Sequence, residues 1–265
     1  MALSTHAAGS LPELVDVALG IRSTLAANDF LWFRGITCSG HSLLPKIMRD
    51  GKSEKEIFER EGRLLTRFRQ RGLAYWPAGY PQNDWEQLFA MQHYGLPTRL
   101  LDWSENIFVA AYFALHTTPG HDHEGKPCTP VIWCIDPVLW NRNMPGPSEY
   151  GTEIHVLTTT EDHLLPYEPM TKRPRSKSPL AIFGTHNSER IVAQRGTFVV
   201  WGNVPDPLDD FAKAPGTVLL WKIALTGPRD QLYRDLQALG FGETMVFPEL
   251  SYLAAELTRT EGWRA

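Results

Sequence analysis

The chain has 265 residues, of which 43% are hydrophobic and 21% are charged. This length and composition are typical of a globular protein with one large domain or two small ones. The formal net charge of -4 argues against a general electrostatic grip on nucleic acid, although a local basic patch is compatible with it. No apolar run approaches the ~20 residues of a membrane-spanning helix, so we expect no membrane partner.

Cysteine usage and the N-terminus bear on the cellular compartment. Cys38, Cys128 and Cys134 form no CxxC pair and leave one cysteine over, which predicts a reducing environment without a disulfide framework. The N-terminal residues lack the basic region and the apolar run of a signal peptide. We therefore expect a cytoplasmic protein.

Hydrophobic periodicity predicts mostly helices in the first half of the chain. Apolar residues at helical spacing follow Ser10, which suits an N-cap, and they predict a helix within an N-terminal segment of residues 1–28. A short aromatic run at residues 30–33 predicts a strand that is closed by Arg34 and Gly35. Further helices are expected at residues 53–71, 84–93 and 104–116.

Strand patterns dominate the second half. The sequence VIWCI at residues 131–135 predicts a buried strand, whereas residues 141–180 show little periodicity and are expected to form an insertion or lid loop. Later strands are expected at residues 190–201 and 217–225, and later helices at residues 228–238 and 250–258. The whole chain, residues 1–265, is therefore expected to be a single α+β domain.

The densest group of polar side chains lies at residues 91–104, with the sequence MQHYGLPTRLLDWS, just before an apolar segment at residues 107–115. Burying an arginine and an aspartate is costly unless each is paired and hydrogen-bonded. The segment therefore predicts an organised polar site that lies on a buried platform.

Arg34 is a candidate for ligand binding outside that segment. It follows an apolar strand, and Gly35 lets a ligand or another backbone approach closely. A guanidinium held in this way suits bidentate binding of a phosphate. The alternative is a structural arginine paired with an acid such as Asp102.

Within the polar segment, His93 closes a helix, where it suits a ribose hydroxyl or acid–base chemistry, or else caps its own helix. Thr98, Arg99, Asp102 and Ser104 flank the expected start of the next helix. Because helix N-termini favour anions, these residues suit a pyrophosphate. The alternative is that Ser104 is only an N-cap and that Arg99 and Asp102 form a structural pair.

Three further segments hold candidates. Glu189 and Gln194 lie in the later β-rich stretch, where an acid at a strand edge would orient a ribose hydroxyl, or would simply be a surface glutamate. The basic segment at residues 172–177 suits a solvated loop or, as the alternative, a local contact for a polyanion. The remaining candidates match no common zinc spacing, so we expect no metal site; they are His116, His121, His123 and Cys128.

Four motifs together resemble a known family. They are WFRG at residues 32–35, QHYGLPTRLLDWSEN at residues 92–106, AAYFAL at residues 110–115 and RIVAQRGTF at residues 190–198. In combination they are similar to the FRG domain, a family named for its Phe-Arg-Gly motif. The central motif is long enough to be specific.

A weaker resemblance connects the chain to enzymes of the ADP-ribosyltransferase fold, which have a split β core with flanking helices. It implies that Arg34 holds the pyrophosphate or ribose of NAD, that Thr98 and Ser104 lie along the nicotinamide, and that Glu189 is the catalytic acid. The usual Ser-Thr-Ser motif is absent, and the expected glutamate position falls on Arg190. The alternatives for the catalytic group are His93, Asp102 and Gln194.

The resemblance implies an ADP-ribosyltransferase or NAD glycohydrolase that cleaves the nicotinamide–ribose bond of NAD, with Arg34, His93 and Glu189 as catalytic residues. Other NAD-binding residues are expected to be Gln92, Thr98, Arg99, Asp102, Trp103, Ser104 and Gln194. The ADP-ribose would pass to water or to an unknown protein or nucleic-acid acceptor, as in a toxin or an anti-phage effector. Two alternatives stay open: a non-catalytic nucleotide or nucleic-acid sensor, and a nuclease that uses His93 and Asp102.

Overall fold

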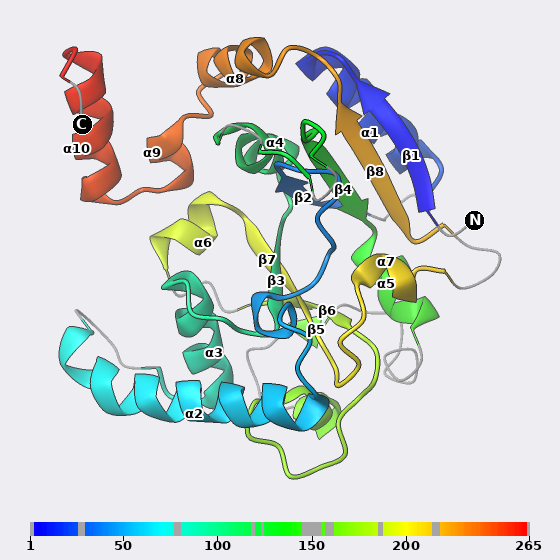
Figure 1. The fold of residues 1–265 in the computed structure, drawn as a ribbon, viewed down its shortest axis with the longest axis vertical. Helices are drawn as coiled ribbons and strands as arrows, with labels where there is room; N and C mark the ends of the chain where they lie inside the picture. The colour runs from blue at the N-terminus through cyan, green and yellow to red at the C-terminus, as the bar shows by residue number, and fades with distance from the viewer. Residues whose placement is uncertain are drawn as a thin grey trace.

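The structure, a computed structural model, describes residues 3–25, 30–76, 81–117, 120–122, 125–144, 155–156, 162–184, 188–213 and 218–263. Within these ranges, eight strands form one mixed sheet (Figure 1). The strands are β1 (Leu3–Ala8), β2 (Trp32–Ile36), β3 (Leu100–Ser104), β4 (Val131–Ile135), β5 (His155–Val156), β6 (Leu180–Phe183), β7 (Gly196–Val200) and β8 (Leu220–Leu225).

Helices surround this sheet and follow it at the C-terminal end of the chain (Figure 1). They are α1 (Leu11–Ser23), α2 (Glu54–Gly72), α3 (Asp84–His93), α4 (Ile107–Leu115), α5 (Pro137–Asn143), α6 (Glu189–Ala193), α7 (Leu208–Phe211), α8 (Arg229–Ala238), α9 (Glu243–Val246) and α10 (Leu250–Thr260). The fold is thus a mixed α/β arrangement with flanking helices.

The strand order is β1-β8-β4-β2-β3-β7-β6-β5, and neighbouring strands are antiparallel except for the pairs β1–β8 and β5–β6. β2 pairs with β4 along its whole length, and β3 pairs likewise with β7. Between β2 and β3, however, the register contains the single pair Phe33–Ser104. The sheet therefore consists of two halves that diverge beyond that pair, and we call this divergence the split.

Two apolar layers cover the half-sheet that contains β4. Val131, Trp133 and Ile135 of β4 belong to one core cluster, and the alternate residues Ile132 and Cys134 belong to the other. Because strand residues alternate between faces, this division places a core on each side of the strand. The prediction of a fully buried strand at residues 131–135 is confirmed.

Helix α4 packs very close to β2, and Gly35 is the residue that permits it. A Cβ atom at this position would lie 1.7 Å from the backbone oxygen of Ala110 and 2.8 Å from the backbone nitrogen of Ala114. The expected close approach of another backbone at Gly35 is thus confirmed. This close approach lets α4 pack directly against β2, the strand that carries Arg34.

Several elements differ from the sequence expectations. Strand β1 precedes α1, so the N-terminal segment is not only a helix, and β1 and β3 are two strands of the first half that the sequence did not predict. The expected loop at residues 141–180 contains part of α5 and the first residue of β6, and Tyr167 is fully buried. Its residues 145–154 and 157–161 lie outside the described residues.

Two site-bearing segments were assigned to the wrong element. Ser104 ends strand β3 and does not cap a helix; Asn106 caps α4 by accepting a hydrogen bond from the Phe108 amide at 2.9 Å. Glu189 begins helix α6 rather than a strand, because the Ser188 hydroxyl accepts from the Ile191 amide and starts a helical turn. Strand β7 begins only after Arg195, whose positive φ of 46° ends that turn.

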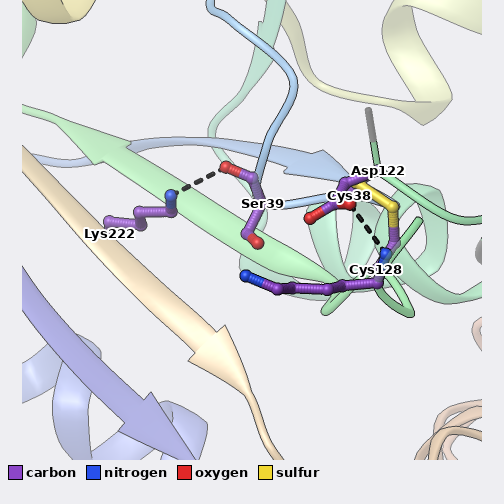
Figure 2. Close-up of a disulfide and its surroundings, with 6 residues drawn as sticks. Cys38, Ser39, Asp122, Cys128 and Lys222 are labelled. Atoms are coloured by element: carbon purple, nitrogen blue, oxygen red, sulfur yellow. Dashed lines mark hydrogen bonds between the residues drawn. A yellow bond between two sulfur atoms is a disulfide. The ribbon is translucent and has the colours of Figure 1, made fainter. Parts of the chain in front are cut away.

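A disulfide joins Cys38, just beyond β2, to Cys128, which precedes β4, with 4.6 Å between their Cα atoms (Figure 2). The carbonyl oxygen of the adjacent Ser39 accepts a hydrogen bond from Lys222 Nζ at 2.9 Å. The expectation of no disulfide was wrong, since cysteines 90 residues apart carry no spacing signal. The argument for a reducing compartment no longer stands.

In the described ranges, no helix combines the length and apolar composition needed to cross a bilayer.

Reduction of this disulfide is expected to lower the free energy of unfolding by about 2–4 kcal/mol, because the bond restricts the unfolded chain. Urea denaturation with and without dithiothreitol measures the effect. The double variant Cys38→Ser/Cys128→Ser is the control and should be insensitive to the reductant. Equal stability of the oxidised and reduced wild-type protein would contradict a structural role.

Candidate functional site

A cavity of about 260 Å³ opens at the split between β2 and β3, and we call it the cleft. Its walls come from β2, β3 and β7 of the sheet and from α3, α4 and α6. The cleft brings together seven of the expected site residues: Arg34, Gln92, His93, Asp102, Trp103, Ser104 and Gln194. The cleft thus gathers seven of the expected residues, and the other three, Thr98, Arg99 and Glu189, lie elsewhere.

Asp102 occupies the middle of β3, between the buried Leu101 and Trp103, so strand alternation turns it away from their core. Gln92 Nε2 donates hydrogen bonds to both carboxylate oxygens, at 3.0 and 2.8 Å. The Thr98 hydroxyl donates to the Gln92 amide oxygen and accepts from the backbone amide of Leu100. This chain of donors and acceptors fixes the Gln92 amide and, through it, the carboxylate.

Arg34 faces Asp102 across the split. Its Nη1 donates to the backbone oxygen of Asp102 at 2.6 Å and lies 3.9 Å from the carboxylate Oδ2. The Nε of Arg34 is buried and has no hydrogen-bond partner among the described residues. Arg34 thus pairs with Asp102, as the structural alternative expected, and it also lines the cleft.

Burial shifts the ionisation of both groups. Although 53% of the Asp102 side chain is accessible, it lines the cleft, and desolvation raises its pKa above the usual aspartate value. The charge of Arg34 and the Gln92 hydrogen bonds oppose that rise. Burial lowers the pKa of Arg34, yet a guanidinium remains protonated. The cleft therefore holds a cation beside a carboxylate that protonates more readily than usual.

The opposite wall carries Arg190, which the sequence interpretation had treated only as a displaced position. Its Nε donates to Glu249 Oε1 at 2.9 Å, and its guanidinium lies 4.8 Å from the Phe247 ring centre. His93 lies beside it, and burial, followed by the charge of Arg190, lowers the pKa of His93. His93 is therefore mainly neutral near pH 7. Its Nδ1 is 3.4 Å from the Ser188 hydroxyl.

Ser104 and Gln194 connect the strand to this wall. The Ser104 hydroxyl donates to the backbone oxygen of Gln194 at 2.6 Å, and the Gln194 amide donates to the Val246 oxygen at 3.0 Å. Thr197, which sequence reasoning missed, also lines the cleft; its buried hydroxyl has no hydrogen-bond partner within the described part of the chain. Thr197 lies opposite Trp103 in the β3–β7 register, a relation that strand pairing alone reveals.

Arg99 and Thr98 do not line the cleft. Arg99 is fully buried, with its Nε 3.0 Å from a Glu61 oxygen. It also donates to the backbone oxygens of Trp201 and Tyr167. All of these partners lie within the protein, so Arg99 here has the role of a buried structural arginine, paired with Glu61 rather than with Asp102. Thr98 acts on the site only through Gln92.

Glu189 is exposed on α6 and is not a lining residue. Among the described residues, Asp102 is the single carboxylate that lines the cleft. The helical turn after Ser188, which sequence reasoning took for a strand, is the reason for this difference. The carboxylate in the cleft is thus that of Asp102 and not that of Glu189.

The histidine-rich loop offers no metal centre within the described residues, where no group of three potential ligands gathers. Cys128 is bonded to Cys38, and His123 lies outside the described residues.

Comparison with known proteins gives one family. The family model of the FRG domain matches residues 29–123. The matched segment contains β2, β3 and α4, including Arg34, Gln92 and Asp102, whereas β7 and α6 lie beyond it. No curated protein and no solved structure matches the chain. The resemblance carried by the WFRG and QHYGLPTRLLDWSEN motifs is confirmed, and the chain contains an FRG domain.

Proposed function

We propose that the protein is an ADP-ribosyltransferase-like enzyme that binds NAD in the cleft and cleaves its nicotinamide–ribose bond. One observation carries the proposal: a single oriented carboxylate, Asp102, faces Arg34 across a split in the sheet. Cleavage of this bond develops positive charge on the ribose, and a fixed carboxylate stabilises such charge in a desolvated site. The Gln92–Thr98 chain provides the fixed geometry.

The reaction requires few protein groups. The bond between ribose C1′ and the nicotinamide nitrogen breaks, and nicotinamide leaves with the bonding electrons. Water or an acceptor group then bonds to C1′ and loses a proton. In this scheme Asp102 stabilises the cationic ribose and accepts a hydrogen bond from a ribose hydroxyl, and His93, as a neutral imidazole, is available to take the proton.

The other cleft residues suit the remaining parts of NAD. Arg34 and Arg190 are guanidinium groups of the kind that binds a pyrophosphate. Phe113 and Phe247 offer aromatic surface for the nicotinamide ring. The cavity of about 260 Å³ is below the ~300–1,000 Å³ typical of ligand pockets, so it suits the reacting end of NAD with the remainder lying outside.

Replacing Asp102 with asparagine is expected to reduce nicotinamide release about 100- to 1,000-fold, the usual cost of removing a preorganised charge-stabilising group. Chromatographic measurement of nicotinamide formed from NAD tests this. Glu189→Gln is the matched control and should keep wild-type activity, because Glu189 lies outside the cleft. Loss in Glu189→Gln with retention in Asp102→Asn would reverse the assignment. No release by the wild type, with or without cell lysate, would reject the enzyme.

The pH dependence follows from the raised pKa of Asp102. Because the reaction needs the ionised carboxylate, activity should fall on acidification at a higher pH than an ordinary aspartate would give.

The raised pKa of Asp102 also affects the stability of the fold, which should decrease, and not increase, as the carboxyl ionises. A carboxyl whose pKa is raised on folding destabilises the fold as pH rises through that pKa, so Asp102→Asn should retain or increase the melting temperature at pH 7. A large drop in melting temperature would instead attribute lost activity to misfolding.

A further inference from the structure

The second half of helix α2 is strongly basic. Residues 62–72 contain four arginines and no acidic residue, although the whole chain has a net charge of -4. Arg63, Arg67 and Arg71 follow one another at intervals of four residues, which places them along one side of the helix. All three are exposed. Arg67 and Arg71 have no ion-pair partner among the described residues.

Arg63 and Arg67 form one wall of an open groove of about 920 Å³, which we call the arginine groove. The other wall is the segment of residues 169–175, which contributes Arg173 and Arg175. Five basic and two acidic residues line the groove, so its charge is positive. One of the acids, Glu59, already lies 3.7 Å from Arg63.

Arg175 is held in a defined position within the arginine groove. Its guanidinium donates to the backbone oxygens of Glu168 and Pro169, at 3.0 and 2.9 Å. It also stacks 3.7 Å above the centre of the Phe58 ring. Ordering of this kind is typical of a binding surface, because less side-chain entropy is lost on binding.

At the C-terminal end of α2 the arginine stripe meets a group of aromatic rings, which we call the aromatic cluster. It surrounds a hollow of about 310 Å³ that Arg71 also lines, and it consists of Phe68, Tyr75, Trp76 and Tyr94. The Trp76 and Tyr94 ring centres are 6.0 Å apart and meet edge to face. Tyr75 and Tyr94 are 85% and 57% exposed, so ring surface is available for stacking.

The aromatic cluster adjoins the cleft. Tyr94 directly follows α3, and its ring centre lies 4.7 Å from that of His93, which lines the cleft. In Figure 1, α2 runs along one side of the molecule and α3 lies between it and α6, which borders the cleft. The arginine groove, the aromatic cluster and the cleft therefore follow one another across adjacent elements.

We propose that a single-stranded nucleic acid binds along α2, with its phosphates in the arginine groove and an unpaired base on the aromatic cluster. Arginine grooves beside exposed rings are the arrangement by which proteins hold single strands, since phosphates meet the cations and bases stack on the rings. A duplex keeps its bases stacked on each other and would leave the rings unused. An acidic peptide would contact the arginines through its carboxylates but has no bases to stack on the rings. This binding does not depend on NAD, so the inference stands apart from the proposed function.

Fluorescence anisotropy with a labelled single strand of about 12 nucleotides, as DNA and as RNA, tests the proposal without NAD. Tyr94→Ala should weaken binding about 5- to 100-fold through the loss of one stacked base. In Arg67→Ala/Arg71→Ala, the slope of log affinity against log salt should fall by about 0.7 for each arginine removed. Arg142→Ala removes an exposed arginine on α5, away from these surfaces, and should bind like the wild type.

The inference is overturned if neither strand binds, or if Tyr94→Ala binds as the wild type does. Equal binding of a duplex, or full competition by polyglutamate, would show a general anion surface and would also overturn it. Its failure is distinguishable from failure of the proposed enzyme. Asp102→Asn should bind the strand normally, and strand binding without nicotinamide release would reject only the NAD chemistry.

Discussion

Arg99→Met is expected to lower the free energy of unfolding by about 3–5 kcal/mol, because it leaves the carboxylate of Glu61 buried without a partner. Both side chains are fully buried, so water cannot replace the lost guanidinium. The backbone oxygens of Trp201 and Tyr167 lose their donors as well. Urea denaturation at pH 7 measures the change, with two-state behaviour tested by two spectroscopic probes.

An exposed ion pair on α2, the helix that carries Glu61, provides the comparison with the buried pair. Arg63 and Glu59 of α2 are 3.7 Å apart and about half exposed, so Arg63→Met should cost less than about 1 kcal/mol. The double variant Arg99→Met/Glu61→Leu should recover part of the loss, since it removes both buried charges. Equal effects of Arg99→Met and Arg63→Met would contradict the importance of burial. No recovery in the double variant would assign the cost to the two backbone oxygens.

Gly35→Ala is expected to destabilise the protein by about 3 kcal/mol or more, at the upper end of the range for overpacked cores. The added methyl would lie 1.7 Å from the backbone oxygen of Ala110 and 2.8 Å from the backbone nitrogen of Ala114. Because these are backbone atoms, no side-chain rotation relieves the clash. Helix α4 must then move away from β2. Because Arg34 precedes this position, the same displacement should disturb the cleft. Thermal unfolding monitored by circular dichroism measures the loss.

Gly20→Ala is the matched control for that substitution. Gly20 lies within α1, and a Cβ atom there would have no neighbour within 4 Å. Alanine at an exposed helical position should therefore stabilise the fold by about 0.5–1 kcal/mol. Opposite signs for the two substitutions would support the close approach of α4. A gain in stability from both would refute it.

The fold was predictable where the hydrophobic pattern was long or uninterrupted. The amphipathic helix now seen as α2 and the apolar strand β4 were both expected, the first from its periodicity and the second from five consecutive buried residues. Strand β3 was missed because the exposed, polar Asp102 lies at its centre, with two buried residues on each side. In so short a sequence, this pattern resembles the start of a helix. Strand β1 was missed because, of its six residues, only Ala8 is buried, so the strand has no alternating apolar pattern.

The site was predictable as a segment but not as a set of contacts. The polar density at residues 91–104 pointed to Gln92 and Asp102, whose side chains the structure joins by a hydrogen bond of 2.8 Å at the cleft. The partner of Arg99 was not predictable, because Glu61 lies in helix α2, 38 residues away in the sequence, and only folding brings it near. Ion pairs between distant elements depend on packing, and the sequence around either member carries no sign of the other.

The position of β8 in the sheet has a consequence for synthesis of the protein. This strand lies between β1 and β4, and its residues Leu220–Leu225 follow β1 by more than 200 positions. At ~5–20 residues per second, β1 is synthesised about 10–40 s before β8, its single neighbour among the described strands. During that interval the edges of β1 and β4 that later pair with β8 stay unpaired, and unpaired strand edges favour aggregation. The half-sheet that holds Arg34 is completed only after β8 has been synthesised.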